Sequence, residues 1–265
     1  MTAGRYLGKH VQSLSRSLQN LSSGFRINSA MDDAAGLAVS EGMKSRIRGL
    51  GMAERNALDG VSVVQTAEGS MAEISDIIIR MRELTVQSAN DSITDTERGY
   101  LSLEFTELSE EIDRISQATK HNGMSLLDGS LGGGLDFQVG HDSGAANRIN
   151  VSFADTTLTG LGLGGAAGVG TKANALTTMD DLDAALDTLN TGRALLGSRG
   201  NRLQIAASAV ATQRENLSAA NSRIRDVDIA RESSELARNQ ILLQAAVAMK
   251  VQANQGPQLL LALLG

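Results

Sequence analysis

Cysteine and tryptophan are absent from the 265 residues, and Pro257 is the single proline. The lack of cysteine excludes disulfides, thiolate catalysis and cysteine-ligated metals. Aromatic residues make up 2% of the chain although 42% of it is hydrophobic, so aliphatic side chains must form the core. That composition favours long, thin helix seams over a globular core, in which aromatic rings supply much of the buried area. Because proline breaks helices, almost nothing in the sequence interrupts them.

Two further absences limit the function classes. The net charge is −6 with both signs interspersed, so the basic surface that nucleic-acid binding requires is missing. No run of 18 apolar residues exists, and no basic segment followed by an apolar one opens the chain. We therefore expect neither a membrane-spanning helix nor a cleaved secretory signal.

The first helix predicted by the sequence has a narrow apolar stripe. Between residues 6 and 25 the apolar side chains recur at alternating steps of four and three, which is a heptad seam. A similar stripe without a local partner lies between residues 236 and 264. We expect the two ends to pair and, because each seam still leaves apolar faces, to pack against other subunits. The predicted subunit-packing residues are Leu7, Val11, Leu14, Leu18, Leu21, Phe25, Leu236, Leu243, Val247, Val251, Leu260 and Leu263.

Three more helices are predicted between these ends. Ser29 and Asp32 match a capping box, which predicts a helix from about residue 30 to 56, with a junction at residues 58–60. The next helix, to about residue 89, carries a seam at Val64, Ala67, Met71, Ile74, Ile78 and Met81. A second capping box, Thr94 with Glu97, starts another helix that ends at Asn122-Gly123.

The middle of the chain, residues 124–174, is rich in glycine and small polar residues. Two alternating runs, residues 135–140 and 148–153, predict a β-hairpin, which we expect at the tip of the molecule. Helix then returns at Thr178, with Asp181 as part of its cap, and an unbroken heptad pattern to residue 224 predicts a helix of roughly 70 Å.

The predicted fold is mainly α: long antiparallel helices forming a coiled-coil-like rod, a small β-hairpin region, and paired N- and C-terminal helices. We expect residues 1–35 and 226–265 to form one domain. Residues 36–225 form the other, with the hairpin region at about 124–174.

No catalytic, cofactor or metal site is predicted. His10, His121 and His141 are far apart in sequence, without carboxylates at ligand spacing. The acidic pairs at residues 32–33 and 180–181 are explained by helix N-termini. Residues 160–165 satisfy G-x-G-x-x-G, but no helix follows them and no βαβ unit surrounds them. The chain is therefore not expected to be an enzyme.

Four stretches closely resemble bacterial flagellins. Three lie in the N-terminal half, namely 21–41 (LSSGFRINSAMDDAAGLAVSE), 55–69 (RNALDGVSVVQTAEG) and 80–90 (RMRELTVQSAN). The fourth is residues 216–255, from NLSAANSRIRDVDIARE to KVQANQ. Only about two dozen residues separate Phe153 from Thr178, so the chain is similar to a short flagellin that lacks the outer variable domains.

The resemblance implies a structural subunit that self-assembles into the extracellular flagellar filament and serves motility. The terminal helices would line the filament core, and the rest would form an outer layer. It further implies type III export through the flagellar apparatus, an export chaperone on the C-terminal segment, and a filament cap as partner. Arg80, Leu84 and Glu104 match the family surface that a host Toll-like receptor contacts and that packs subunits.

Three alternatives stay open at this point. A hook-filament junction protein shares the terminal helices but does not form long polymers alone. A secreted coiled-coil binding or assembly module of another kind would form a discrete oligomer at all concentrations. An enzyme would be stabilised by a nucleotide, which we do not expect.

Overall fold

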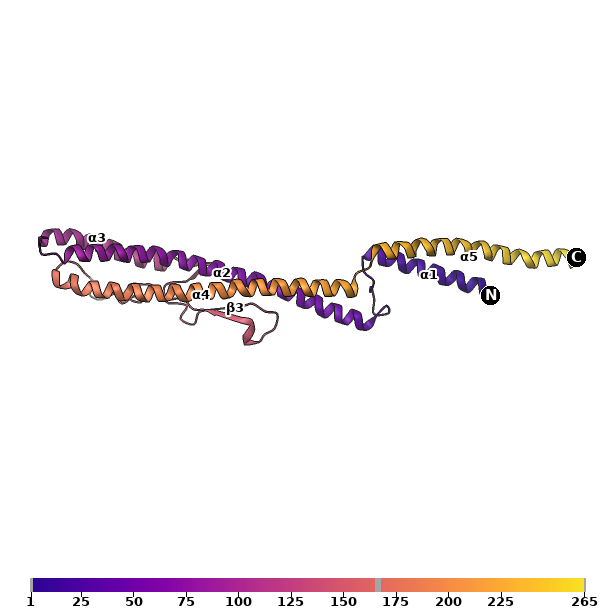
Figure 1. Cartoon of the computed structure of the whole chain (residues 1–265), viewed down its shortest axis with the longest axis horizontal. Helices are drawn as coiled ribbons and strands as arrows, with labels where there is room; N and C mark the ends of the chain where they lie inside the picture. Colours follow the sequence, from indigo (N-terminus) through magenta and orange to yellow (C-terminus); the bar gives the residue numbers. More distant parts are fainter. Residues whose placement is uncertain (1, 165–167, 265) are drawn as a thin grey trace. The chain divides into compact units, whose positions relative to one another are not determined.

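The computed structural model describes the backbone of residues 2–164 and 168–264 and the side chains of residues 4–164 and 168–253. In chain order the helices are α1 (Thr2–Ser23), α2 (Ala34–Ser88), α3 (Asp95–Ala118), α4 (Lys172–Arg225) and α5 (Ile229–Leu264) (Figure 1). The chain divides into two compact units, unit 1 (Met1–Arg48 with Arg214–Gly265) and unit 2 (Gly49–Gln213). The predicted mainly α architecture with paired terminal helices is confirmed.

The helix α2 is a single element of 55 residues, about 80 Å at ~1.5 Å per residue. The predicted helix end near residue 56 and the junction at residues 58–60 are therefore wrong. Gly60 does not end the helix. It is buried, and a Cβ atom there would stand 3.0 Å from both Leu203 and Phe137. This glycine allows α4 and the β region to approach α2 closely.

Two helices begin at other residues than predicted. The carboxylate of Asp32 accepts hydrogen bonds from the Asn28 and Ser29 amides, so it closes a turn before α2. Asp33 instead accepts a bond from the amide of Gly36 in the first turn of α2, at 2.9 Å. Likewise α4 starts at Lys172 rather than at residue 178.

At that start the hydroxyl of Thr171 accepts a bond from the Asn174 amide. The residue expected at the start, Thr178, is fully buried and exchanges hydrogen bonds with the backbone of Gly168.

The predicted start of α3 is confirmed, but its predicted end is wrong, because the helix ends at Ala118 and not at Asn122-Gly123. Thr94 and Glu97 form the capping box in both directions, since the Thr94 side chain accepts from the Glu97 amide and the Glu97 carboxylate accepts from the Thr94 amide. After α3, Asn122 and Gly123 have φ angles of 48° and 79°. They form the two-residue turn between β1 (Lys120–His121) and β2 (Met124–Ser125), which pair antiparallel.

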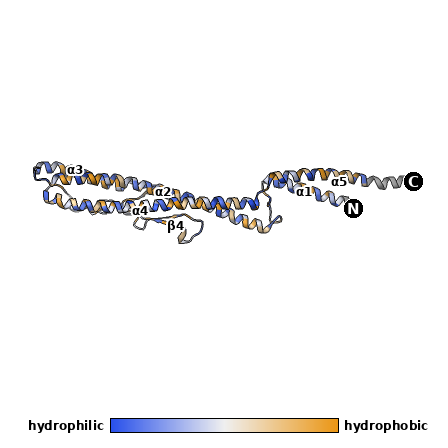
Figure 2. Cartoon of the chain, viewed as in Figure 1, coloured by the Kyte–Doolittle hydropathy of each residue, from blue (hydrophilic) through white to orange (hydrophobic). Residues whose placement is uncertain are grey.

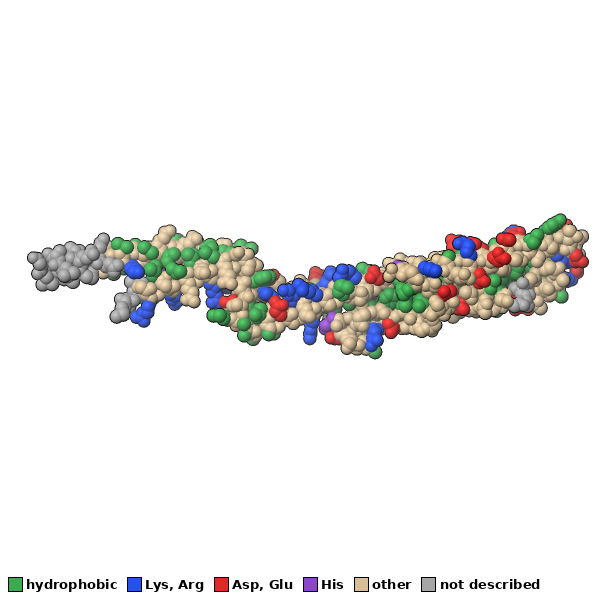
Figure 3. Space-filling view, turned by 180° about the vertical axis from the view of Figure 1, so that it is seen from behind, with side chains coloured by type: hydrophobic (Ala, Val, Ile, Leu, Met, Phe, Trp, Pro, Cys, Tyr) green, Lys and Arg blue, Asp and Glu red, His purple; other side chains and the backbone are tan. Residues whose placement is uncertain are grey.

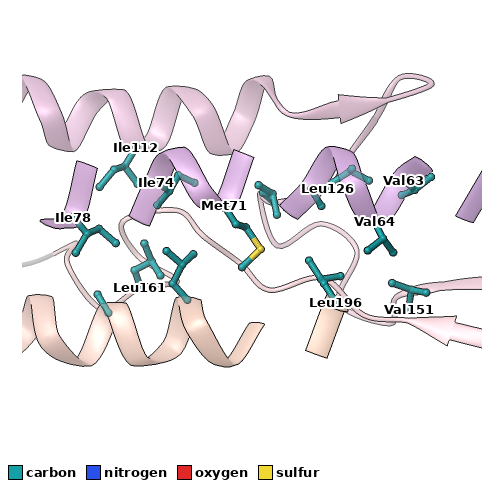
Figure 4. Close-up of a cluster of buried hydrophobic side chains, with 14 of the residues drawn as sticks. Val63, Val64, Met71, Ile74, Ile78, Ile112, Leu126, Val151, Leu161 and Leu196 are labelled. Carbon is teal, nitrogen blue, oxygen red and sulfur yellow. The ribbon is translucent and has the colours of Figure 1, made fainter. Parts of the chain in front are cut away.

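The β-hairpin of the middle region also forms. β3 (Leu135–Gln138) pairs antiparallel with β4 (Arg148–Val151), with Phe137 opposite Ile149, and a short 3₁₀ helix η1 (Ala145–Asn147) precedes β4. The prediction that this region lies at the tip of the molecule was wrong. Its leucines lie in the core of unit 2 among side chains of α2, α3 and α4 (Figure 4). Within unit 2 the helices lie side by side and the hairpin lies along them, not at their ends (Figure 1).

The core of unit 2 follows the predicted seam of α2. All six predicted positions, from Val64 to Met81, are 5% exposed or less. They pack against Phe105 and Ile112 of α3 and against the buried side chains of α4. Figure 2 shows the corresponding alternation of hydrophobic and hydrophilic residues along α2 and α4. Buried residues of α4 are Ala175, Thr178, Leu182, Ala185, Leu189, Leu196, Leu203, Ala207 and Val210.

Candidate functional site

The candidate site is the pair formed by α1 and α5 in unit 1. The two helices lie side by side and antiparallel, because α1 ends and α5 begins at the same joint (Figure 1). They come from opposite ends of the sequence, so their contact brings the N-terminal and C-terminal segments of the chain together. None of the described helices is both long and apolar enough to cross a membrane.

The joint at the base of the pair is held by backbone hydrogen bonds. The Arg26 amide donates to the Arg225 carbonyl at 2.7 Å, and the Val227 amide donates to the Gly24 carbonyl at 3.0 Å. Phe25 and Asp226 form an isolated antiparallel bridge between them. We call residues 24–28 and 223–227 the terminal clamp.

Arginine side chains complete the terminal clamp. Nη2 of Arg26 donates to the carbonyls of Arg223 and Ile224, two of the groups that the end of α4 leaves without helical partners. The guanidinium of Arg225 lies 4.7 Å from the centre of the Phe25 ring and pairs with Glu41 at the start of α2. The hydrogen bond from Arg225 lowers the pKa of Glu41. The clamp therefore fixes how α1 and α5 leave the rest of unit 1.

Among the described residues of α1, the two buried side chains are polar. On α1, Ser17 and Asn20 are 4% and 7% exposed, although neither was predicted as a contact residue. A cleft of about 810 Å³ opens beside them. It is lined by Ser13, Arg16, Ser17, Asn20, Arg26, Ser222, Arg223, Asp226, Val227, Asp228, Arg231, Glu232, Glu235 and Asn239.

The apolar residues predicted for packing divide into two groups. Leu7, Leu14, Leu21, Leu236 and Leu243 are half-buried. The others with described side chains are 38 to 53% exposed, and these are Val11, Leu18, Phe25, Val247 and Val251. Leu260 and Leu263 lie outside the described side chains.

More apolar residues are exposed on the same helices than the heptad pattern indicated. Tyr6 of α1 and Ile229, Ile241 and Met249 of α5 are 62 to 68% exposed. Figure 3 shows apolar side chains gathered along this pair. An exposed apolar surface of this kind is typical of a protein interaction site.

A second group of predicted residues lies in unit 2. Nε and Nη2 of Arg80 donate to Glu104 of α3 at 2.9 and 2.7 Å, and Nη1 donates to Glu83 at 2.9 Å. These bonds raise the pKa of Arg80, and all three side chains are exposed. Leu84 is different. It is 1% exposed and belongs to the core, so its assignment to a surface is wrong.

The described residues hold no group of three or more histidine, aspartate or glutamate side chains that could bind a metal ion. The three histidines lie in α1, β1 and the loop after β3. Gly160, Gly162 and Gly164 lie in a loop, where Gly162 has a φ of 78°. What the described geometry offers is a packing surface rather than a reaction centre.

Comparison with known protein families identifies the kind of protein that carries this surface. The family model of the bacterial flagellin N-terminal helical region matches residues 1–132, and that of the C-terminal helical region matches residues 179–264. This chain belongs to the bacterial flagellin family. As a flagellin it is a structural subunit of the flagellar filament, serves motility and is not an enzyme. The filament lies outside the cell.

Known flagellar filament proteins match over all or nearly all of the chain. The flagellin of Halalkalibacterium halodurans is 43% identical, with 100% of this chain and 96% of that protein covered. The flagellar filament 33 kDa core protein of Treponema phagedenis is 41% identical with the same coverage. The Bacillus subtilis flagellin is 42% identical over 94% of this chain and 92% of its own length.

Solved structures agree on the flagellin fold. The crystal structure of Bacillus cereus flagellin has a TM-score of 0.52 and 31% identity, and covers 63% of this chain and 94% of its own. A putative flagellar hook-associated protein from Vibrio parahaemolyticus has a TM-score of 0.62, covering 74% of this chain and all of its own. At 15% identity that second likeness shows a shared fold only.

Proposed function

We propose that this flagellin polymerises through the exposed apolar residues of α1 and α5. This proposal rests on the exposure of apolar side chains on two helices that already contact each other. The exposed fractions of Val11, Leu18, Ile241 and Val247 are 46 to 67%. Burying apolar surface stabilises association by about 25 cal/mol per Å². The apolar surface that the pair leaves open therefore favours contact with further copies.

A filament requires that the contact does not close on itself. Residues on one side of the pair must meet different residues on the next copy, since only such heterologous interfaces extend into helical polymers. The terminal pair, with exposed apolar residues on both of its helices, fits that requirement. Residues 1–35 and 226–265 would form the filament core, and residues 36–225, with the hairpin region at 124–174, its outer layer.

Further partners follow from family membership. An export chaperone would bind the C-terminal segment before the chain passes through the flagellar export apparatus, and the filament cap would receive it. In unit 2 the exposed Arg80 and Glu104 would contact neighbouring subunits or a host Toll-like receptor. Their mutual ion pair would have to open or be shared in either contact.

The assembly proposal is tested by seeded polymerisation. Leu18→Asp places a charge on α1, and Leu176→Asp places the same charge on an equally exposed leucine of α4, since both are 51% exposed. We expect L18D to elongate seeds at least about tenfold more slowly than the wild type, and L176D to stay within about threefold. Removal of residues 226–265 should abolish elongation. Equal rates for L18D and the wild type would contradict the proposal.

The same experiment separates the hook-filament junction alternative. If the wild-type chain formed only discrete particles with and without seeds, a junction role would explain the fold better than a filament role. Electron microscopy of the products distinguishes the two outcomes directly.

A further inference from the structure

Arg225 lies where the terminal clamp meets the start of α2. It is the last residue of α4, and residues 226–228 separate it from the start of α5. Its carbonyl accepts the clamp hydrogen bond from the Arg26 amide, and its guanidinium lies over the ring of Phe25. The same guanidinium pairs with Glu41 of α2. Arg225 therefore contacts the segment after α1 and the start of α2 at the point where the chain turns into α5.

The surroundings of Arg225 do little to offset the cost of burying a charge. Its side chain is 13% exposed, whereas the side chain of Glu41 is 50% exposed. Among the described residues, Nε of Arg225 is buried without a hydrogen-bond partner. Burying a guanidinium costs free energy, and a partly exposed ion pair returns little of it. The position of Arg225 is therefore better explained by the segments that it joins than by the stability that it adds.

The ion pair gives the terminal clamp a contact with α2 that the backbone does not supply. The backbone hydrogen bonds of the clamp run between the segment after α1 and the segment that links α4 to α5. They hold the end of α1 beside the start of α5 but do not include α2. The side chain of Arg225 extends this contact to Glu41, in addition to the chain connection from α1 to α2 through residues 24–33.

We propose that Arg225 is a positioning residue for filament assembly, because its pairing with Glu41 holds the terminal clamp against α2 and so presents α1 and α5 to the next copy in one direction. A surface that is already oriented loses less conformational entropy on association than one that association must order. Arg225 need not touch the neighbouring copy, since it acts through the helices that it positions. This inference rests on the proposed assembly through α1 and α5.

Arg225→Gln tests this role, because glutamine removes the charge that pairs with Glu41 and lies over Phe25. We expect R225Q to elongate seeds about tenfold more slowly than the wild type, with the circular dichroism of the monomer unchanged. Arg225→Lys keeps the charge for both contacts and should stay within about threefold of the wild type. An R225Q variant that elongated at the wild-type rate would overturn the inference. Loss of helicity in the R225Q monomer would also overturn it, because Arg225 would then act through folding.

Lys44→Gln is the matched control. Nζ of Lys44 lies 3.8 Å from the Glu41 carboxylate, so K44Q removes an equal charge beside the same partner but leaves the terminal clamp unchanged. Its elongation rate should stay within about threefold of the wild type. Equal slowing of K44Q and R225Q would contradict the inference, since it would assign the effect to the charge around Glu41 and not to the clamp.

A double-mutant cycle tests whether Arg225 and Glu41 act together. Glu41→Ala should slow elongation about tenfold, as R225Q does. The double variant R225Q/E41A should be no slower than either single variant, because all three lack the same contact. Slowing that multiplied to about a hundredfold in the double variant would show two independent effects and contradict the role of this pair.

A distance measurement separates this inference from the assembly proposal. Because the chain has no cysteine, spin labels can be attached at Gln19→Cys of α1 and Ser45→Cys of α2, both at exposed positions. We expect a narrow distribution of label distances in the monomer with Arg225 or R225K, and a broader one in R225Q. Equal widths would overturn the positioning role even if filaments formed. If the wild type formed no filaments, the assembly proposal would fail, and the widths would still decide whether Arg225 positions α1 relative to α2.

Discussion

Gly60 lies inside α2 at a point where a side chain would meet two other elements. A Cβ atom would stand 3.0 Å from Leu203 of α4 and from Phe137 of β3. We expect Gly60→Val to lower the free energy of unfolding by about 1–3 kcal/mol, because the added methyl groups overpack this contact. Urea denaturation followed by circular dichroism measures the change.

Gly69 is the matched control for Gly60. It lies in the same helix and is exposed, and a Cβ atom there would meet no other element within 4 Å. Gly69→Val should leave the stability unchanged or raise it slightly, because valine has a higher helix propensity than glycine. A similar loss in both variants would show that propensity, not the contact with Leu203 and Phe137, explains Gly60.

Asp32 makes the turn before α2 sensitive to acid. Hydrogen bonds from the Ser29 and Asn28 amides and the Ser29 hydroxyl, together with Arg16, hold the pKa of Asp32 below its ordinary value of 3.8, against the opposing effect of partial burial. Because the folded-state pKa is the lower one, this stabilisation is fully present above pH 3.8 and is lost as the pH falls through the folded value.

Asp32→Asn should therefore be less stable than the wild type near neutral pH. The difference between their urea midpoints should shrink as the pH is lowered through and below 3.8. A difference that stayed constant over this range would mean that the Asp32 charge does not stabilise the turn.

Residue patterns predicted burial well in unit 2 and poorly in unit 1. The seam from Val64 to Met81 is buried as expected because its partners, α3 and α4, belong to the same chain. In α1 the same heptad spacing marks residues such as Leu18 that stay exposed, while Asn20 is buried. Periodicity identifies a face that needs a partner but does not say whether that partner is in the same molecule.

At the scale of elements, the capping box of α3 offers the clearest test. The hydroxyl of Thr94 accepts from the Glu97 amide at 3.4 Å, and the Glu97 carboxylate accepts from the Thr94 amide at 2.8 Å. Thr94→Ala should lower the free energy of unfolding by about 1 kcal/mol, the usual effect of removing such a cap. Thr96→Ala is the control, because it lies in the same turn and is exposed. Equal losses in both variants would argue against the cap.

The sequence predicted which helices and strands exist, but it did not always predict the residues at which they begin and end. Thr94 with Glu97 is a true cap, whereas Ser29 with Asp32 has the same spacing and closes a turn. Gly60 was predicted to lie at a junction between helices and Thr178 at the start of one. Both residues are instead buried inside helices by tertiary contacts. Local signals cannot separate these cases, because the deciding neighbours are far away in sequence.

At the scale of the whole molecule, charge is divided unevenly between the two units. Unit 1 carries 13 lysine and arginine residues against 8 aspartate and glutamate residues, and unit 2 carries 11 against 22. The net charge of −6 hides this difference. In the proposed filament, copies of unit 2 would come close to one another, and their like charges would oppose the contacts that we propose for α1 and α5.

Elongation should therefore accelerate with ionic strength. Between about 0.01 and 0.1 M salt the Debye length falls from about 30 to 10 Å, so repulsion between neighbouring copies of unit 2 is increasingly screened. We expect the seeded elongation rate to rise several-fold over this range, measured by light scattering. Replacing the exposed Glu107 and Glu110 of α3 with glutamine should raise the rate at low salt and flatten its salt dependence. A rate that fell with added salt would show instead that attraction between unlike charges of units 1 and 2 drives the encounter.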